Sequence, residues 1–241
     1  MCPTSSSEAR DARRSDLAAR LAEVTARIEK ACALAGRDLS EVTLIAVTKT
    51  YPVEDVRLLR ELGVHDFGEN RDQEGKVKAA QSVELDIAWH FIGQLQTRKA
   101  SSVAQYADYV HSVDRARLVS HLGPAARAAD REITCLVQVS IDGDPERGGV
   151  PASDVAAVAE AIEAEPSLVL GGVMTIAPMG MDPAAAFAAL SDSAGTVRGI
   201  RPAAGIISAG MSSDLEQAVA AGATHLRIGT ALLGDRKPPV R

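Results

Sequence analysis

The run VTLIAVTKT at residues 42–50 decides how the chain folds. Its first six residues are apolar or β-branched and too few for a helix, so they predict a strand buried on both faces, as in a parallel sheet. Pro52 follows, and the next apolar residues recur at helical spacing up to Gly63: Val53, Val56, Leu59 and Leu62. Proline at a helix start and glycine just past its end are typical of helix boundaries. We therefore expect one strand–helix unit over residues 42–63.

The same unit recurs, in form though not in sequence, along the rest of the chain. Each further apolar run is short, ends in a small or polar turn, and is followed by a helical pattern. The seven runs lie at residues 66–67, 90–92, 109–110, 133–139, 168–174, 205–207 and 225–228. Eight strand–helix units in 241 residues predict an α/β protein with a single (β/α)8 TIM barrel. A doubly wound open sheet is the alternative, since counting strands in one sequence can err by a unit.

The chain ahead of the first strand predicts one extra helix. From Asp16 to Gly36, apolar residues recur three or four apart and give one apolar face: Leu17, Leu21, Val24, Ile28 and Cys32. Residues 1–15 are small and polar, so we expect a flexible segment there. No linker divides the remainder, and residues 16–241 are expected to form a single domain.

The composition narrows the class of function. Hydrophobic residues make up 46% of the chain and charged residues 24%, which is typical of a globular protein and excludes a disordered one. The formal net charge is −6, which argues against nucleic acid or an anionic membrane as the main partner. Three cysteines without a CxxC pattern predict neither a disulfide framework nor a zinc site. With no apolar run of about 18 residues and no secretory signal pattern, we expect a cytoplasmic protein.

Barrel enzymes and binding proteins of this type carry their sites at the C-terminal ends of the strands. The polar residues in those positions are Lys49, Asn70, His90, Gln94, His111, Ser208, Arg227 and Thr230. Lys49 is the lysine that directly follows an apolar strand. Loss of water there favours the neutral amine, which attacks an aldehyde to form a Schiff base. A lysine that merely extends from a strand end to solvent is the alternative, and position alone does not decide between them.

Two small-residue turns predict an anion site nearby. Residues 208–213 (SAGMSS) precede a helix with a Ser213-x-x-Glu216 capping box, and residues 227–230 (RIGT) span the end of the last strand and the turn after it. Loops after strands seven and eight are the frequent phosphate site of barrels, although a capped helix and a tight turn would look the same. Taken with Lys49, they indicate a ligand that carries both a phosphate and a carbonyl group. Pyridoxal 5′-phosphate (PLP) carries both.

Other candidate residues give weaker signals. His90 and His111 could act as acid–base groups, but isolated histidines are more often structural. Glu69 and Asn70 could line the site or cap the next helix. The run at residues 142–144 looks like a turn and lacks the later glutamate of a calcium loop, so no metal site is expected.

Five runs, in this order, resemble the pyridoxal phosphate homeostasis protein family: Ala46–Thr50, Phe67–Asn70, Trp89–Gly93, Ser208–Ser213 and Arg227–Thr230. The resemblance implies a single-domain barrel related to the N-terminal domain of alanine racemases. It also implies that Lys49 forms an internal aldimine with PLP. The other cofactor contacts implied are the phosphate contacts Ser208, Gly229 and Thr230, backbone amides of Met211 and Ser212, Arg227 facing the pyridine nitrogen, and Asn70 lining the pocket.

The resemblance implies a binding protein rather than a strong catalyst. A cation at the ring nitrogen, as expected for Arg227, disfavours protonation of the pyridine and makes it a poorer electron sink. Seven residues follow Gly234, so we expect no second domain with the opposing base of a racemase. The expected function is PLP homeostasis by buffering and delivery, with PLP-dependent apoenzymes as candidate partners and a monomer as the default state. A PLP-dependent amino-acid racemase is the alternative, and a Schiff-base aldolase a weaker one.

Departures from the family pattern fall on the pocket wall. Gln94 stands where proline is common, Ala209 where methionine is usual, and Thr48 where serine is usual. They bear on the shape of the open face of the pocket rather than on Lys49 or the phosphate contacts.

Overall fold

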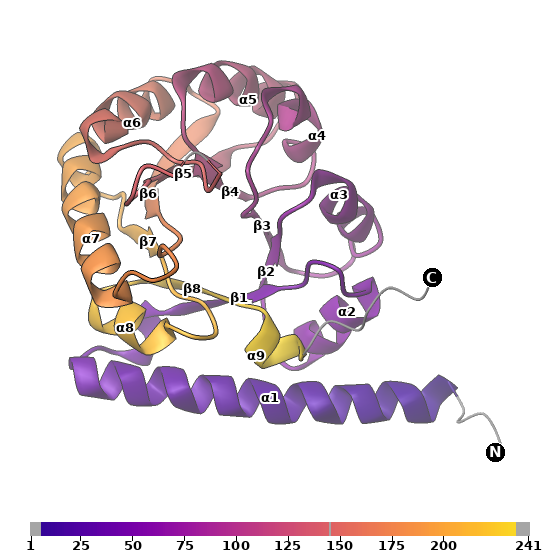
Figure 1. The fold of residues 1–241 in the computed structure, drawn as a ribbon. Coiled ribbons are helices and arrows are strands. Elements are labelled where there is room, and N and C mark those ends of the chain that lie inside the picture. Colours follow the sequence, from indigo (N-terminus) through magenta and orange to yellow (C-terminus); the bar gives the residue numbers. More distant parts are fainter. Residues whose placement is uncertain (1–5, 145, 235–241) are drawn as a thin grey trace.

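The computed structural model describes residues 6–144 and 146–234, and eight parallel strands close into a barrel (Figure 1). The strands are β1 Thr43–Val47, β2 Asp66–Glu69, β3 Ala88–Phe91, β4 Tyr109–Val113, β5 Ile133–Gln138, β6 Leu168–Met174, β7 Ile206–Ser208 and β8 His225–Ile228. The last strand pairs with the first, with Thr43 opposite His225 and Ala46 opposite Ile228. Closure confirms the predicted (β/α)8 TIM barrel and excludes the open sheet.

Helices surround the strands as a ring (Figure 1). They are α1 Ser6–Ala35, α2 Val53–Glu61, α3 Asp72–Ala80, α4 Ala100–Val103, α5 Ala116–Ala128, α6 Val155–Glu163, α7 Pro183–Ile200, α8 Leu215–Ala220 and α9 Thr230–Leu233. The short α9 begins directly after the turn at Gly229 and was not predicted. Within the part of the chain that the structure describes, every helix is too short or too polar to cross a lipid bilayer.

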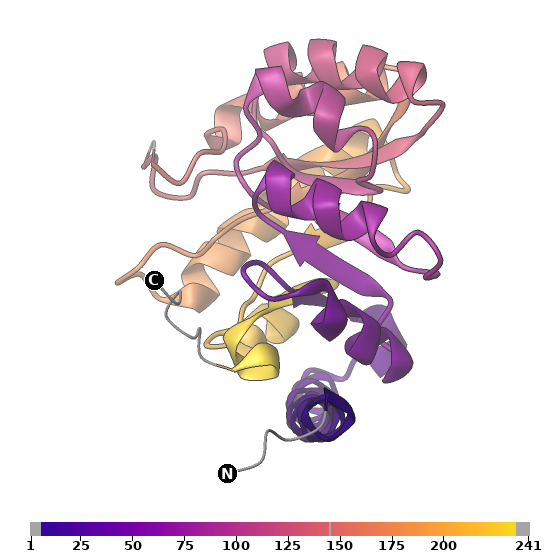
Figure 2. The ribbon, with the colours of Figure 1, turned by 90° about the vertical axis from the view of Figure 1, so that its right-hand side faces the viewer.

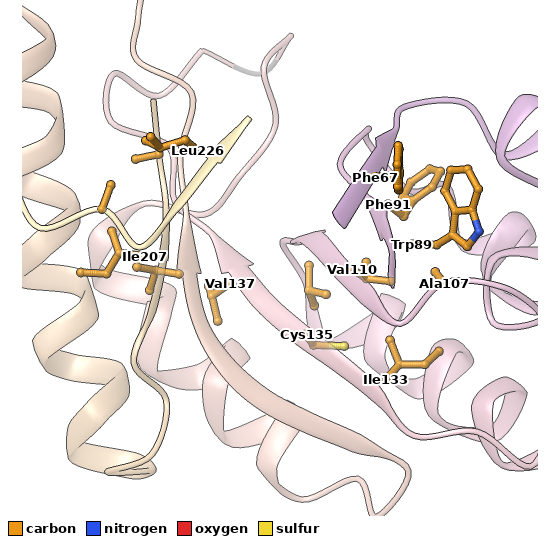
Figure 3. Packing of buried hydrophobic residues seen from close by; sticks show 14 of the residues in the cluster. Phe67, Trp89, Phe91, Ala107, Val110, Ile133, Cys135, Val137, Ile207 and Leu226 are labelled. Atoms are coloured by element: carbon orange, nitrogen blue, oxygen red, sulfur yellow. The ribbon is translucent and has the colours of Figure 1, made fainter. Parts of the chain in front are cut away.

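The strands bury different side chains on their two faces. Phe67, Trp89 and Phe91 lie in the layer between strands and helices, where Figure 3 shows them packed together. The rings of Phe67 and Trp89 have centroids 6.0 Å apart. Because side chains alternate along a strand, the neighbouring His90 faces the barrel interior instead. The interior is thus partly polar, although the sequence predicted strands that are apolar on both faces.

The N-terminal helix α1 is longer than predicted. Its 30 residues begin at Ser6, ten positions before the expected start at Asp16, so that boundary is wrong. Figures 1 and 2 show α1 lying along the outside of the barrel, where it contacts α8, α9 and α2. Arg13 holds its first turns, since Nε and Nη2 donate to the two carboxylate oxygens of Asp55 on α2 at 3.0 and 2.7 Å. Residues 1–5 lie outside the described residues, and flexibility of the N-terminal segment 1–15 stays a prediction.

We expect Arg13→Ala to lower the free energy of unfolding by about 1–3 kcal/mol, because it leaves the buried Asp55 carboxylate without its charged donor. Urea denaturation would measure the change. Arg10→Ala is the matched control, since Arg10 pairs with Glu61 in solvent and should change stability by about 0.5 kcal/mol or less. Equal losses in the two variants would contradict a specific role for Arg13.

Candidate functional site

A cleft of about 680 Å³ opens at the C-terminal ends of the strands. This volume lies within the roughly 300–1,000 Å³ of small-molecule sites. Seven of the eight residues predicted to bind a cofactor line the cleft: Lys49, Asn70, Met211, Ser212, Arg227, Gly229 and Thr230. The eighth, Ser208, lies below the cleft with its side chain fully buried. The structure therefore brings together residues from four different strand ends.

Lys49 lies in a tight turn directly after β1. The preceding Thr48 is fully buried, whereas Lys49 is half-buried at the edge of the cleft. Thr50 has a φ of 70°, a conformation that is uncommon for a residue other than glycine. Its backbone N–H donates to Glu74 Oε2 at 2.9 Å, and the Tyr51 N–H donates to the Thr48 carbonyl at 3.0 Å. These bonds fix the turn and hold the Lys49 backbone at the cleft.

A buried ion pair supports this turn from behind. Lys78 of α3 donates to Glu69 Oε1 at 2.6 Å and to the Thr48 carbonyl at 2.7 Å. The Thr48 hydroxyl donates to the same Glu69 oxygen at 2.7 Å. Burial raises the pKa of the Glu69 carboxyl, while the charge of Lys78 opposes that shift. Sequence reasoning missed this group, because neither a glutamate at a strand end nor a lysine in a helix signals a contact between them.

The open question about Glu69 and Asn70 is resolved by their placement. Glu69 faces α3 and is fully buried, so it neither lines the cleft nor caps the helix. Asn70 lines the cleft. Gly93 permits this arrangement, because a Cβ at that position would lie 2.1 Å from the Asn70 carbonyl oxygen. The glycine is therefore required for the close approach of the two loops.

Arg227 is a buried cation at the cleft. Its Nη1 donates to Ser208 Oγ at 2.7 Å, and its Nη2 donates to the Thr175 carbonyl at 2.7 Å. Burial lowers its pKa to about 10, and the charge of Asp214 partly opposes that shift. The guanidinium therefore remains charged at neutral pH, and its two bonds hold it in one orientation.

The predicted phosphate loop is partly occupied by the chain's own groups. The Met211 N–H donates to Asp214 Oδ1 at 2.6 Å, and Ser212 Oγ accepts from the Ala231 N–H at 3.2 Å. The capping box predicted at residues 213–216 is wrong: α8 begins at Leu215, with Asp214 as the residue before it and no side-chain cap. Glu216 was expected in that box. Its side chain instead pairs with Arg27 of α1 at 2.8 Å, which apolar patterns could not predict.

His90 and His111 lie in the barrel interior rather than along the cleft. His90 Nδ1 and His111 Nε2 are 2.9 Å apart, and His111 Nδ1 is 2.9 Å from Ser208 Oγ. Burial, together with the nearby Arg227 cation, places the pKa of His111 well below its ordinary value, so the ring is neutral. This placement favours the structural interpretation of the two histidines over the acid–base one.

We expect Lys78→Met to lower the free energy of unfolding by about 3–5 kcal/mol, because it leaves the Glu69 carboxylate buried without its cation. The double variant Glu69→Gln/Lys78→Met should be more stable than Lys78→Met alone. Chemical denaturation would measure both, with Lys76→Met on the exposed face of α3 as the control, expected within about 0.5 kcal/mol of wild type. If Lys78→Met matched Lys76→Met, the buried pair would have no structural role.

Comparisons with known proteins match most of this chain. The family model for the N-terminal domain of alanine racemase matches residues 20–237. A Corynebacterium glutamicum protein named pyridoxal phosphate homeostasis protein is 40% identical over 218 residues, covering 88% of this chain and 98% of that protein. A Pseudomonas aeruginosa protein of the same name is 39% identical, with 92% and 96% covered.

Solved structures extend the comparison to the fold. PipY of Synechococcus elongatus, solved with PLP bound, has a TM-score of 0.78 and 33% identity, covering 90% of this chain and all of that one. Alanine racemase from Corynebacterium glutamicum has a TM-score of 0.67 at 14% identity, covering 91% of this chain and 60% of that one, which is a likeness of fold alone. Given the family model and the relatives at about 40% identity over most of their length, the chain belongs to the pyridoxal phosphate homeostasis protein family.

Proposed function

We propose that the chain binds PLP in the cleft at the end of β1 and serves PLP homeostasis by buffering and delivering it, without strong catalytic activity. The observation that carries the proposal is the meeting of Lys49, Arg227 and the Gly229–Thr230 turn in one cleft. PLP supplies an aldehyde that a lysine amine converts to a Schiff base with loss of water. Lys49 is the residue proposed to hold it in this way.

The charges of the cleft suit an anionic ligand. Lys49 and Arg227 line its inner part, while at the rim Glu146 is the one lining carboxylate among the described residues and Arg147 pairs with Asp142 and Asp144. Small residues at the Gly229–Thr230 turn leave room for a phosphate group, as is common at this end of a barrel. The PLP bound to the PipY relative, which is 33% identical, supports the same ligand here.

Arg227 bears on how reactive a bound cofactor would be. A guanidinium only donates hydrogen bonds, so facing the pyridine nitrogen it would leave that atom unprotonated. An unprotonated ring withdraws electrons poorly, and carbanion chemistry at the substrate is then weakly supported. This supports a carrier over a racemase.

The cleft also offers few groups for proton transfer. Among the described residues that line it, none is a histidine, tyrosine or cysteine, and the titratable groups other than arginine are Lys49 and Glu146. His90 and His111 lie beneath it and are hydrogen-bonded to other interior groups. The chain therefore holds PLP in the cytoplasm, as a monomer, with PLP-dependent apoenzymes as recipients.

We expect Lys49→Ala to abolish the PLP adduct that borohydride traps on the protein, because it removes the amine that attacks the aldehyde. Absorbance before and after reduction, with peptide mass mapping, would measure the adduct. Lys76→Ala removes an exposed lysine of α3 and should keep the wild-type spectrum and the trapped peptide. An undiminished adduct in Lys49→Ala would overturn the assignment of Lys49.

We expect the PLP-loaded protein to racemise alanine or serine at less than about 1 per second, the lower end of the usual enzyme range. The physical reason is the combination of the Arg227 cation with a cleft poor in acid–base groups. Chiral chromatography of the amino acid over time would measure the rate, with Lys49→Ala as the blank. Turnover well above this value that is lost in Lys49→Ala would favour the racemase instead.

A further inference from the structure

A row of five side chains crosses the barrel interior beneath the cleft. Arg227 Nη1 lies 2.7 Å from Ser208 Oγ, and Ser208 Oγ lies 2.9 Å from His111 Nδ1. His111 Nε2 lies 2.9 Å from His90 Nδ1, and His90 Nε2 lies 2.9 Å from Asp66 Oδ1. Asp66 is the first residue of β2, whereas the cleft lies at the opposite ends of the strands. The row therefore connects the two ends of the barrel.

With both histidine rings neutral, the chemistry of the two ends allows one direction for every bond. The Asp66 carboxylate only accepts, so His90 donates from Nε2 and, as a neutral ring, accepts at Nδ1. His111 must then donate from Nε2 and accept at Nδ1. Ser208 gives its proton to His111 and accepts from Arg227, which only donates. In this arrangement all four bonds run from the arginine toward the carboxylate, and each histidine carries its one ring proton on Nε2.

The surroundings of the row hold this arrangement in place. Ser208 and His111 are fully buried and Arg227 nearly so, while the Asp66 side chain is 24% exposed. Tyr109 stacks on His90 with ring centroids 4.2 Å apart and an interplanar angle of 4°. The stacking sets the plane of the His90 ring and so aims both of its nitrogens.

We propose that Asp66, His90, His111 and Ser208 form a one-way hydrogen-bond relay that positions the Arg227 guanidinium for the ligand and couples it to a carboxylate at the far end of the barrel. The ligand part rests on the proposed function. The four are positioning residues, because they act through Arg227.

The relay offsets part of the cost of burying the Arg227 charge. Both hydrogen bonds found for the Arg227 guanidinium among the described residues end on neutral oxygens, those of Ser208 and Thr175. Burial of a cation in such surroundings is unfavourable, and the charge of Asp214 offsets part of that cost. Successive hydrogen bonds polarise one another, so a chain that ends on Asp66 directs more negative charge toward the guanidinium than an isolated hydroxyl would.

Nitrogen NMR of the histidine side chains tests the relay without PLP. Long-range ¹H–¹⁵N correlation of the wild-type protein should show His90 and His111 as neutral rings protonated at Nε2. Asp66→Asn should shift the ring nitrogens of His111, which it does not touch. Asp108→Asn is the matched control at the same end of the barrel, since Asp108 bonds the Trp89 N–H and Arg131 instead, and it should leave His111 unchanged. A charged or Nδ1-protonated His111, or no shift in Asp66→Asn, would overturn the relay.

PLP titration of the same proteins tests the coupling to the ligand. We expect Asp66→Asn to weaken PLP binding about three- to tenfold, the scale of one hydrogen bond, and Asp108→Asn to stay within about twofold of wild type. Equal affinities of the two variants would overturn the coupling. If wild-type protein failed to take up PLP, the proposed function would fail, while the nitrogen spectra would still decide whether the relay exists.

Discussion

The pairing of β8 with β1 is the constraint on which the site depends. It joins parts of the chain about 180 residues apart, with Ile45 opposite Arg227 in the ladder. In a parallel pair, the residues that follow both strands emerge at the same edge of the sheet. The Lys49 turn and the turn at Gly229 and Thr230 therefore meet at one cleft. An open sheet of the same strands would leave them on opposite edges.

Because side chains alternate along each strand, the polar contacts of the barrel fall into two layers. Outward residues such as Phe67 and Trp89 pack against helices, and Glu69, on the same face as Phe67, meets Lys78 there. Inward residues such as His90 and Arg227 meet in the interior. Each polar layer supports one side of the cleft. The outer one supports the turn that carries the lysine, and the inner one supports the arginine.

Much of the barrel could be predicted from the sequence, because short apolar runs and helical periodicity are local signals. The strands at residues 168–174 and 225–228 are confirmed to the residue. What failed depended on contacts between distant residues. The N-terminal part of α1 is held to α2 by Arg13 and Asp55, and Glu216 pairs with Arg27 rather than with a capping box. No pattern within one segment contains that information.

The site was predictable to the same extent and for the same reason. Lys49 could be singled out because it follows a strand, a property visible in nine residues of sequence. Glu69 and Lys78 could not be linked, since their contact requires the β2–α3 unit to fold back on itself. The row of hydrogen bonds beneath the cleft was equally hidden, because it joins five residues from five strands.

The two supports also bear on the proposal that this cleft holds a ligand rather than transforms it. Proton transfer needs a group that can both give and accept a proton near the reacting atom. Here the interior histidines already form hydrogen bonds, His111 with Ser208 and His90 with Asp66, and Arg227 only donates. Buried groups with satisfied, directional bonds resist changes of protonation state, because each change would leave a neighbour unpaired. An arrangement that holds the Arg227 guanidinium in one orientation supports the proposed carrier role.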